Sequence, residues 1–164
     1  MIKFKAKWMG MFLLPILSGC TWLPWFVIVN KTTAPILVEY TLAGEGRLAP
    51  CPGENGFVMK PRVTTEKMLG EHRVDELPEA KYVCDAKNRK VSLQLNPEEA
   101  VYLFEVPRYH EFRKEEDFRK YTFMEYPVMS IAVESKMGRV EYKGTQVPRD
   151  FAKRNNSLYV LTFE

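Results

Sequence analysis

Five side chains in this sequence, three cysteines and two histidines, could supply sulfur or imidazole ligands to a metal or a reactive thiol or imidazole. They are Cys20, Cys51, Cys84, His72 and His110. A structural zinc site needs closely spaced ligands, such as Cys-x-x-Cys or two histidines a few residues apart, and the sequence has neither pattern. Each histidine lies beside a glutamate, and a solvated loop histidine is far more common than a general base. We therefore expect no metal site and no cofactor.

Two other catalytic motifs are also absent from the sequence. No serine lies in the Gly-x-Ser-x-Gly arrangement that exposes a hydrolase nucleophile. The closely spaced Gly44 and Gly46 lack the continuation that a phosphate-binding loop requires. The sequence therefore predicts a protein that is not an enzyme and has no catalytic residues.

The first twenty residues have the pattern of an exported precursor. Three lysines lie within the first seven residues, and residues 8–17 are then uncharged and mostly apolar. Ten such residues are too few to span a hydrocarbon core of about 30 Å as a helix. The sequence Leu17-Ser18-Gly19-Cys20 follows, and it resembles the lipobox of bacterial lipoprotein precursors. The resemblance implies cleavage before Cys20 and attachment of lipid to that cysteine.

This resemblance divides the chain into three parts. Residues 1–19 would be a signal peptide, residues 20–25 the lipidated cysteine with a short tether, and residues 26–164 a single domain. Thr21 is not the aspartate that tends to retain enterobacterial lipoproteins in the inner membrane, so we expect the outer membrane, facing the periplasm. Trp22 and Trp25 would either lie among the lipid headgroups or cap one end of the core.

The charge of the chain excludes one class of partner. The sequence has 24 basic and 21 acidic residues, and residues 1–19 hold three of the basic ones and none of the acidic ones. The remaining 145 residues are thus formally neutral. A neutral chain has no overall field that attracts phosphates, so we expect no binding of nucleic acid.

Cys51 and Cys84 are the two thiols that remain if Cys20 is lipidated. An even number of thiols in an oxidising compartment favours a disulfide. It would close a loop of about 33 residues, for which the chain-entropy estimate is about 3.5–4 kcal/mol. Two free thiols, a metal site or a catalytic thiol are the alternatives.

The hydrophobic pattern beyond residue 25 has period two or forms short apolar runs. Strands are expected at residues 25–29, 36–42, 57–59, 82–84, 91–95, 101–106, 129–133, 140–142 and 158–163. The first two are expected to form a hairpin, and Pro61 to end the third. Pro127 suggests an edge strand or a bulge where the strand at 129–133 begins. One helical turn is expected at residues 65–69. Residues 147–154 are expected to form a short connection between strands.

This pattern predicts an all-β fold without a long helix. We expect seven to nine strands in a single antiparallel β-sandwich, immunoglobulin-like or transthyretin-like, with a closed barrel as the alternative. The final strand is apolar on both faces, so it should be paired inside a sheet.

Residues 108–120 combine charge with aromatic side chains. Nine of the thirteen residues are charged, and helical spacing places the aromatic residues on no single face. An exposed loop or hairpin tip fits better than an amphipathic helix. Aromatic residues beside arginines often anchor interfaces, so a candidate interaction loop comprises Tyr109, Phe112, Arg113 and Phe118. A solvated loop with its aromatic residues folded back on the core is the alternative.

Two functions remain open. The first is a non-enzymatic interaction or assembly module that binds another envelope protein while lipid on Cys20 holds it to the membrane. The second is a small-ligand binder similar to the bacterial lipocalins, although the sequence lacks a Gly-x-Trp near its first strand. An apolar cavity of several hundred Å³ would favour the ligand binder, and a filled core the interaction module.

Overall fold

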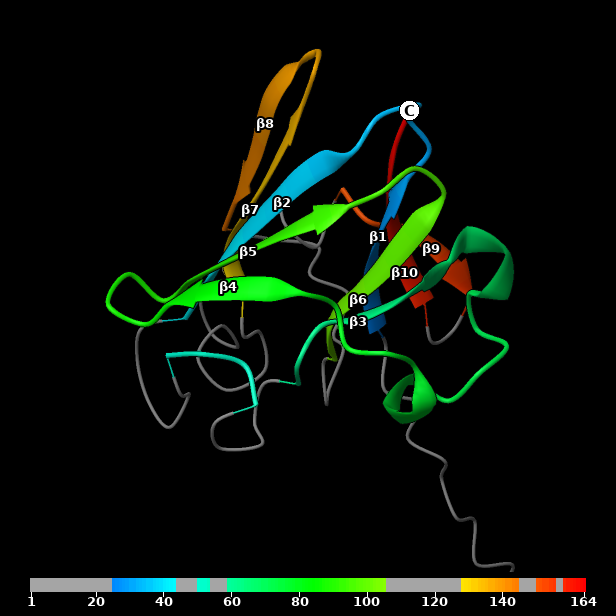
Figure 1. Ribbon diagram of the computed structural model, residues 1–164, viewed down its shortest axis with the longest axis horizontal. Coiled ribbons are helices and arrows are strands. Elements are labelled where there is room, and N and C mark those ends of the chain that lie inside the picture. The colour runs from blue at the N-terminus through cyan, green and yellow to red at the C-terminus, as the bar shows by residue number, and fades with distance from the viewer. Residues whose placement is uncertain (1–24, 44–49, 54–58, 106–127, 145–149, 156–157) are drawn as a thin grey trace, which may run out of the picture.

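The computed structural model of this chain describes residues 25–43, 50–53, 59–105, 128–144, 150–155 and 158–164. These residues form strands and two short 3₁₀ turns, η1 (Glu66–Met68) and η2 (Val74–Glu76) (Figure 1). The ten strands in the described part are β1 Trp25–Asn30, β2 Ile36–Leu42, β3 Arg62–Thr65, β4 Tyr82–Asp85, β5 Lys90–Leu95, β6 Glu99–Glu105, β7 Val128–Ser135, β8 Gly138–Lys143, β9 Ala152–Asn155 and β10 Leu158–Phe163.

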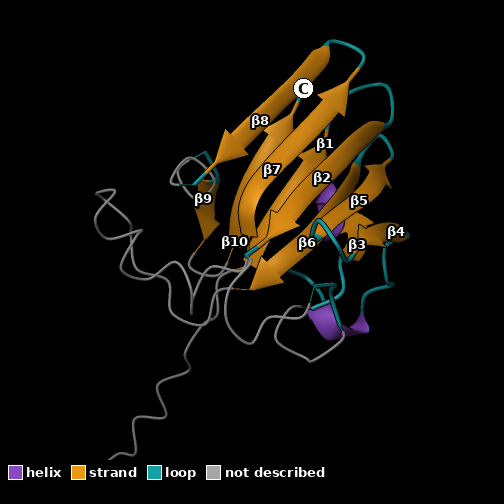
Figure 2. Ribbon diagram, turned by 90° about the vertical axis from the view of Figure 1, so that its left-hand side faces the viewer, coloured by secondary structure: helices purple, strands orange, loops and turns teal. Residues whose placement is uncertain are grey.

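The strands form two five-stranded sheets. Sheet A has the order β3-β6-β1-β10-β9, and sheet B the order β4-β5-β2-β7-β8. The expectation of an all-β, sandwich-like fold is confirmed, and the described strands do not close into the barrel that was its alternative (Figure 2). The expectation of a wholly antiparallel fold is wrong in one place, because β1 and β10 are parallel. The final strand lies between β1 and β9, as its two apolar faces predicted.

The hairpin expected from the first two strands is wrong. β1 pairs with β6 and β10 in sheet A, whereas β2 pairs with β5 and β7 in sheet B. Alternating apolar residues indicate a strand but do not identify its neighbour. The connection between the two strands crosses from one sheet to the other.

Asn30 fixes that crossing. Its side chain is fully buried. The amide nitrogen donates to the carbonyl oxygens of Ala34 (2.9 Å) and Leu95 (3.0 Å), and the amide oxygen accepts from the Thr32 backbone N–H (3.0 Å) and hydroxyl (2.8 Å). One buried side chain therefore joins the end of β1 to the connection that follows it and to the end of β5.

Eight of the nine expected strands are present, and two that were missed, β3 and β9, bring the described total to ten. β3 has only Val63 as a large apolar residue, and β9 has none larger than Ala152. Both strands lie at the outside of sheet A, so pairing with a neighbour rather than apolar periodicity defines them. Of the strand expected at 57–59, residues 57 and 58 lie outside the described residues and Met59 is not in a strand; β3 begins just after Pro61.

Pro127 itself lies outside the described residues, but the strand after it tests the expectation of an edge or a bulge. β7 lies between β2 and β8, so it is not an edge strand. Its register against β2 shifts between Thr41 and Leu42, which pair with Ser130 and Val128. The expected bulge is therefore present near the start of β7, whereas β7 is not an edge strand.

The core lies between the two sheets. On β1, Phe26 stacks on Phe104 of β6, with ring centroids 4.8 Å apart, and on Tyr159 of β10, at 5.2 Å. Aromatic pairs of this kind contribute about 0.5–1.5 kcal/mol beyond their burial. Sheet B supplies the opposite side with Val38 and Tyr40 of β2 and Ile131 of β7, all fully buried.

Candidate interaction surface

The predicted site residues fall into two groups. Cys20 and the candidate interaction loop, Tyr109, Phe112, Arg113 and Phe118, lie outside the described residues. Cys51 and Cys84 lie within them and form a disulfide, with their Cα atoms 6.0 Å apart.

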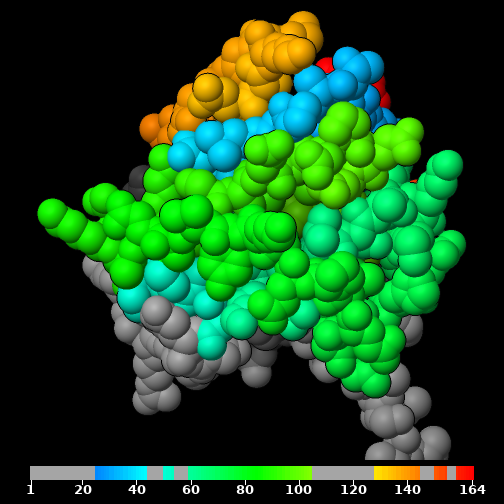
Figure 3. All heavy atoms as spheres, in the orientation of Figure 1, coloured from blue at the N-terminus to red at the C-terminus, as the bar shows by residue number. Residues whose placement is uncertain are grey.

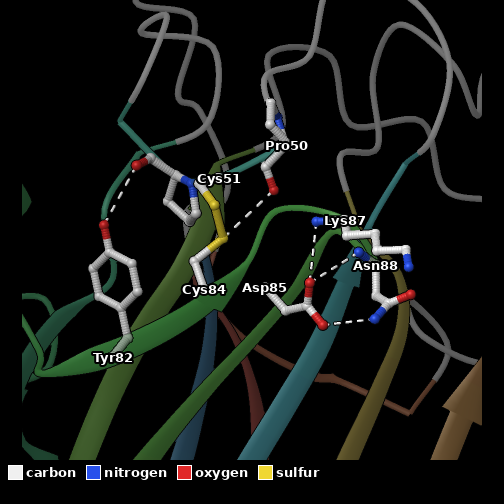
Figure 4. Close-up of a disulfide and its surroundings, with 8 residues drawn as sticks. Pro50, Cys51, Tyr82, Cys84, Asp85, Lys87 and Asn88 are labelled. Atoms are coloured by element: carbon white, nitrogen blue, oxygen red, sulfur yellow. Dashed lines mark hydrogen bonds between the residues drawn. A yellow bond between two sulfur atoms is a disulfide. The ribbon is translucent and has the colours of Figure 1, made fainter.

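The disulfide fastens the segment 50–53 to β4. The Tyr82 hydroxyl donates to the Pro52 carbonyl oxygen at 3.4 Å, and the Cys84 sulfur lies 3.6 Å from the Pro50 carbonyl oxygen (Figure 4). Because the two sulfurs are bonded to each other, neither is available as a nucleophile or a metal ligand.

The remaining chemistry-bearing residues do not assemble. His72 is exposed, and His110 lies outside the described residues. Among the described residues, no three histidine, cysteine or acidic side chains are placed to hold a metal ion. No helix in the described part is long and apolar enough to cross a bilayer.

A charge cluster lies on the outer face of sheet B. Glu39 of β2 forms ion pairs with Lys90 of β5 and with Arg139 of β8, the latter at 2.5 Å. Arg139 also lies 3.4 Å from Glu134 of β7. The Lys90 hydrogen bond, helped by Arg139, lowers the pKa of Glu39 although burial opposes the shift. The cluster joins four adjacent strands and holds the Arg139 side chain over the sheet.

Two hollows lined by described residues lie on the surface. One of about 490 Å³ is bordered by Val63 of β3, Gln94 of β5 and Glu99 of β6, so it lies where the two sheets meet. Its lining mixes apolar and charged side chains. A second hollow of about 290 Å³ shares Val63 and Glu99 with it and extends to Met68 and Leu77. These hollows do not resemble the enclosed apolar cavity of a small-ligand carrier.

Three of the four sheet edges are short or covered. At β3, Val63 N–H donates to the Pro78 carbonyl oxygen and Ala80 N–H to that of Pro61, both at 2.9 Å, so residues 78–80 lie along this edge. Arg62 reinforces it by donating to the Leu77 carbonyl oxygen at 2.9 Å. β9 has four residues, and β4 has four and bears the disulfide. Short or covered edges resist pairing with another chain.

β8 is the exception. It has six residues, pairs with β7 along its whole length, and has no strand among the described residues on its other side (Figure 1). In the space-filling view its orange atoms lie at the upper margin of the molecule (Figure 3). Its side chains alternate: Val140 and Tyr142 lie on the core-facing side, opposite Val133 and Ile131, and Arg139 and Glu141 lie on the outer face. Val140 remains 48% exposed, and Met137 in the preceding turn 92%.

Sequence reasoning found the β7–β8 hairpin but not that β8 lies at the end of sheet B, with no described strand beyond it. The alternation of Val140 and Tyr142 is the same whether a strand has one neighbour or two. The signal that separates the cases, the absence of a further strand beside β8, exists only in the folded arrangement.

Comparison of the chain with protein-family models, with curated proteins and with solved structures finds no match.

Proposed function

We propose that this chain is a lipid-anchored envelope protein that acts as a non-enzymatic interaction module, on the periplasmic face of the outer membrane. The observation that carries the proposal is the edge at β8, which is six residues long, bears alternating apolar and charged side chains, and has no described strand beyond it. Such an edge binds an extended segment of a partner protein through main-chain hydrogen bonds, while the side chains select the partner.

The anchor is part of the proposal. Cys20 precedes β1 by five residues, which reach less than about 20 Å when fully extended. The domain would therefore lie close to the membrane. Trp25, the first residue of β1, is partly buried and contacts the Tyr102 ring edge-on, with centroids 5.9 Å apart, so it serves as a cap on the fold. Trp22 remains the candidate for the headgroup region.

The candidate interaction loop is the second contact that we propose. It joins β6 to β7, and the strand ends that it connects, Glu105 and Val128, lie at the same end of the sandwich as Trp25. Tyr109, Phe112, Arg113 and Phe118 would thus contact an envelope partner near the membrane surface.

The fold supports an interaction module over a ligand carrier. A lipocalin-like carrier needs a closed barrel around an apolar cavity. The described strands form two separate sheets whose facing side chains fill the space between them. The chain crosses between the sheets repeatedly, which supports an immunoglobulin-like or transthyretin-like sandwich as the finer description.

The anchor is tested by fractionation. We expect the Cys20→Ser variant of the full chain to leave the membrane fraction, whereas the wild type stays in it. Continued tight membrane association of the variant would contradict lipid anchoring.

The edge is tested by affinity capture from solubilised envelopes. Glu141→Pro removes the β8 N–H that a partner strand needs, and Glu141→Gln is the matched control that keeps it. We expect the proline variant to lose at least tenfold of the partner recovered with the glutamine variant. Equal recovery with both variants would contradict binding through β8.

A further inference from the structure

We infer that the strand accepted by β8 is β8 of a second copy of this chain, joined in an antiparallel register centred on Val140. The inference rests on the proposed function, namely that the β8 edge accepts a strand. It names the partner, the register and the side chains that specify it.

The main chain of β8 determines which residues can bond to a partner. Gly144 N–H donates to the Met129 carbonyl oxygen at 3.1 Å, so at this position the backbone points toward β7. Backbone direction alternates along a strand. Val140 and Tyr142 therefore bond to β7, and Arg139, Glu141 and Lys143 direct their N–H and C=O groups outward. A partner strand would bond to residues of this outward set.

A two-fold axis at Val140 uses the outward main-chain groups of Arg139 and Glu141. It places Arg139 opposite Glu141 of the second copy and Glu141 opposite Arg139, which gives four main-chain hydrogen bonds. The same pairing sets opposite charges face to face on the outer side of the sheet, where cross-strand charge pairs stabilise. Each side chain already has a partner in its own chain, Arg139 with Glu39 and Glu141 with Lys143 at 3.1 Å, so the new pairs would extend these ion pairs across the two copies. On the other side, the two half-exposed Val140 side chains cover each other.

Neighbouring registers are less favourable. A two-fold axis at Arg139 sets that arginine opposite itself, and one at Glu141 opposes two glutamates, which is destabilising. An axis at Tyr142 pairs Glu141 with Lys143. However, Tyr142 already packs against the core of its own molecule, so pairing it would cover less exposed apolar surface than pairing Val140.

The symmetry is compatible with one membrane. An axis perpendicular to sheet B keeps both copies of sheet A on the same side of the joined ten-stranded sheet. β1 belongs to sheet A, so the segments that lead to the two anchors start on that common side. Both copies can then lie with sheet A toward the bilayer and their strands along it.

Disulfide cross-linking tests the register. In this arrangement the two Val140 Cα atoms form a non-hydrogen-bonded pair about 4.5 Å apart, within the range that a disulfide bridges. The two Glu141 Cα atoms are offset along the strands and lie about 8 Å apart, beyond that range. The variants are therefore Val140→Cys and, as the matched control, Glu141→Cys, each in the full chain carrying Cys20→Ser.

Under a mild oxidant, we expect Val140→Cys to form a covalent dimer at least tenfold faster than Glu141→Cys. Thermal unfolding of each variant checks that it is folded. Equal rates, faster cross-linking of Glu141→Cys, or a ladder of higher species in place of a dimer would overturn the register. A Tyr142→Cys variant that cross-links faster than Val140→Cys would overturn it in favour of the neighbouring axis.

A charge exchange supplies a second measurement. Glu141→Arg leaves only positive charges at the two positions, and Arg139→Glu only negative ones. We expect each variant alone to associate at least tenfold more weakly than the wild type in sedimentation equilibrium, and their mixture to regain association. A mixture that stays monomeric while the wild type dimerises would overturn the charge pairing.

The outcomes separate this inference from the proposed function. If the wild type stays monomeric while Glu141→Pro still abolishes capture of a different envelope protein, the second copy is wrong and the β8 edge remains the binding site. If the wild type stays monomeric and Glu141→Pro captures as much as Glu141→Gln, both are wrong.

Discussion

β3 is an edge strand of sheet A and β8 is an edge strand of sheet B, and the two edges differ in what lies beside them. Along β3, residues 78–80 return and form main-chain hydrogen bonds through Val63 and Ala80. Along β8, the described part of the chain supplies no such segment, and the edge retains an exposed Val140. The difference teaches that this fold can cover an edge with its own chain and does so at β3. Among the described residues no segment covers β8 in this way, and the proposed binding edge rests on that difference.

The edge of sheet B opposite β8 is held by the disulfide of the described part of the molecule. The disulfide fastens the Cys51 segment to the edge strand β4, at the opposite margin of sheet B from β8. Sheet B therefore has one margin fastened by the disulfide and one margin, at β8, beside which no described strand lies. Substitutions at the covered edges should mainly change stability, and substitutions at β8 should mainly change association.

The largest stability effect should come from the fastened margin. Replacing Cys51 and Cys84 together by serine should lower the free energy of unfolding by about 3.5–4 kcal/mol, because the cross-link no longer restricts the unfolded chain. Urea unfolding of oxidised wild type and the double variant measures this. A loss below about 1 kcal/mol would show that the β4 margin is held by other contacts.

The next effect compares one substitution at the two edges. Val63→Pro removes the N–H that donates to Pro78, and we expect a loss of about 1–3 kcal/mol in unfolding free energy. Glu141→Pro removes an N–H without a described partner, so its cost should be below about 1 kcal/mol. Chemical denaturation of both variants provides the comparison. Equal losses would contradict the contrast between the closed and open edges.

The smallest effect concerns the charge cluster beside β8. The lowered pKa of Glu39 means that folding favours its carboxylate. Its contribution is therefore complete above the ordinary value of 4.5 and is lost as the pH falls through the lowered value. We expect Glu39→Gln to cost at most about 1 kcal/mol at pH 7 and less at pH 3. A cost that grows on acidification would contradict this linkage.

The sequence predicted the fold class because period-two patterns survive in nearly every strand that faces the core. It missed β3 and β9, whose side chains lack that pattern and which are defined by hydrogen bonds to distant neighbours. It paired β1 with β2 wrongly, since both carry strong apolar patterns and the buried Asn30, which turns the chain to the other sheet, resembles an ordinary turn residue.

The candidate site was less accessible to sequence reasoning. The disulfide followed from counting cysteines, which is a chemical constraint independent of the fold. The β8 edge depends on what does not lie beside it, and only the strand order reveals this. In the sequence, Arg139 and Glu141 look like ordinary strand residues. Their opposite charges face each other only when two copies of β8 pair about a two-fold axis at Val140.

Amide hydrogen exchange tests the contrast between the edges most directly. The amides of Val63 and Ala80 should exchange slowly at every protein concentration, since their bonds are internal. The amides of Arg139 and Glu141 should exchange rapidly in dilute solution and become protected as the concentration rises. Protection of Arg139 and Glu141 that is already complete in dilute solution, or exchange at Val63 and Ala80 that is equally fast, would contradict the account.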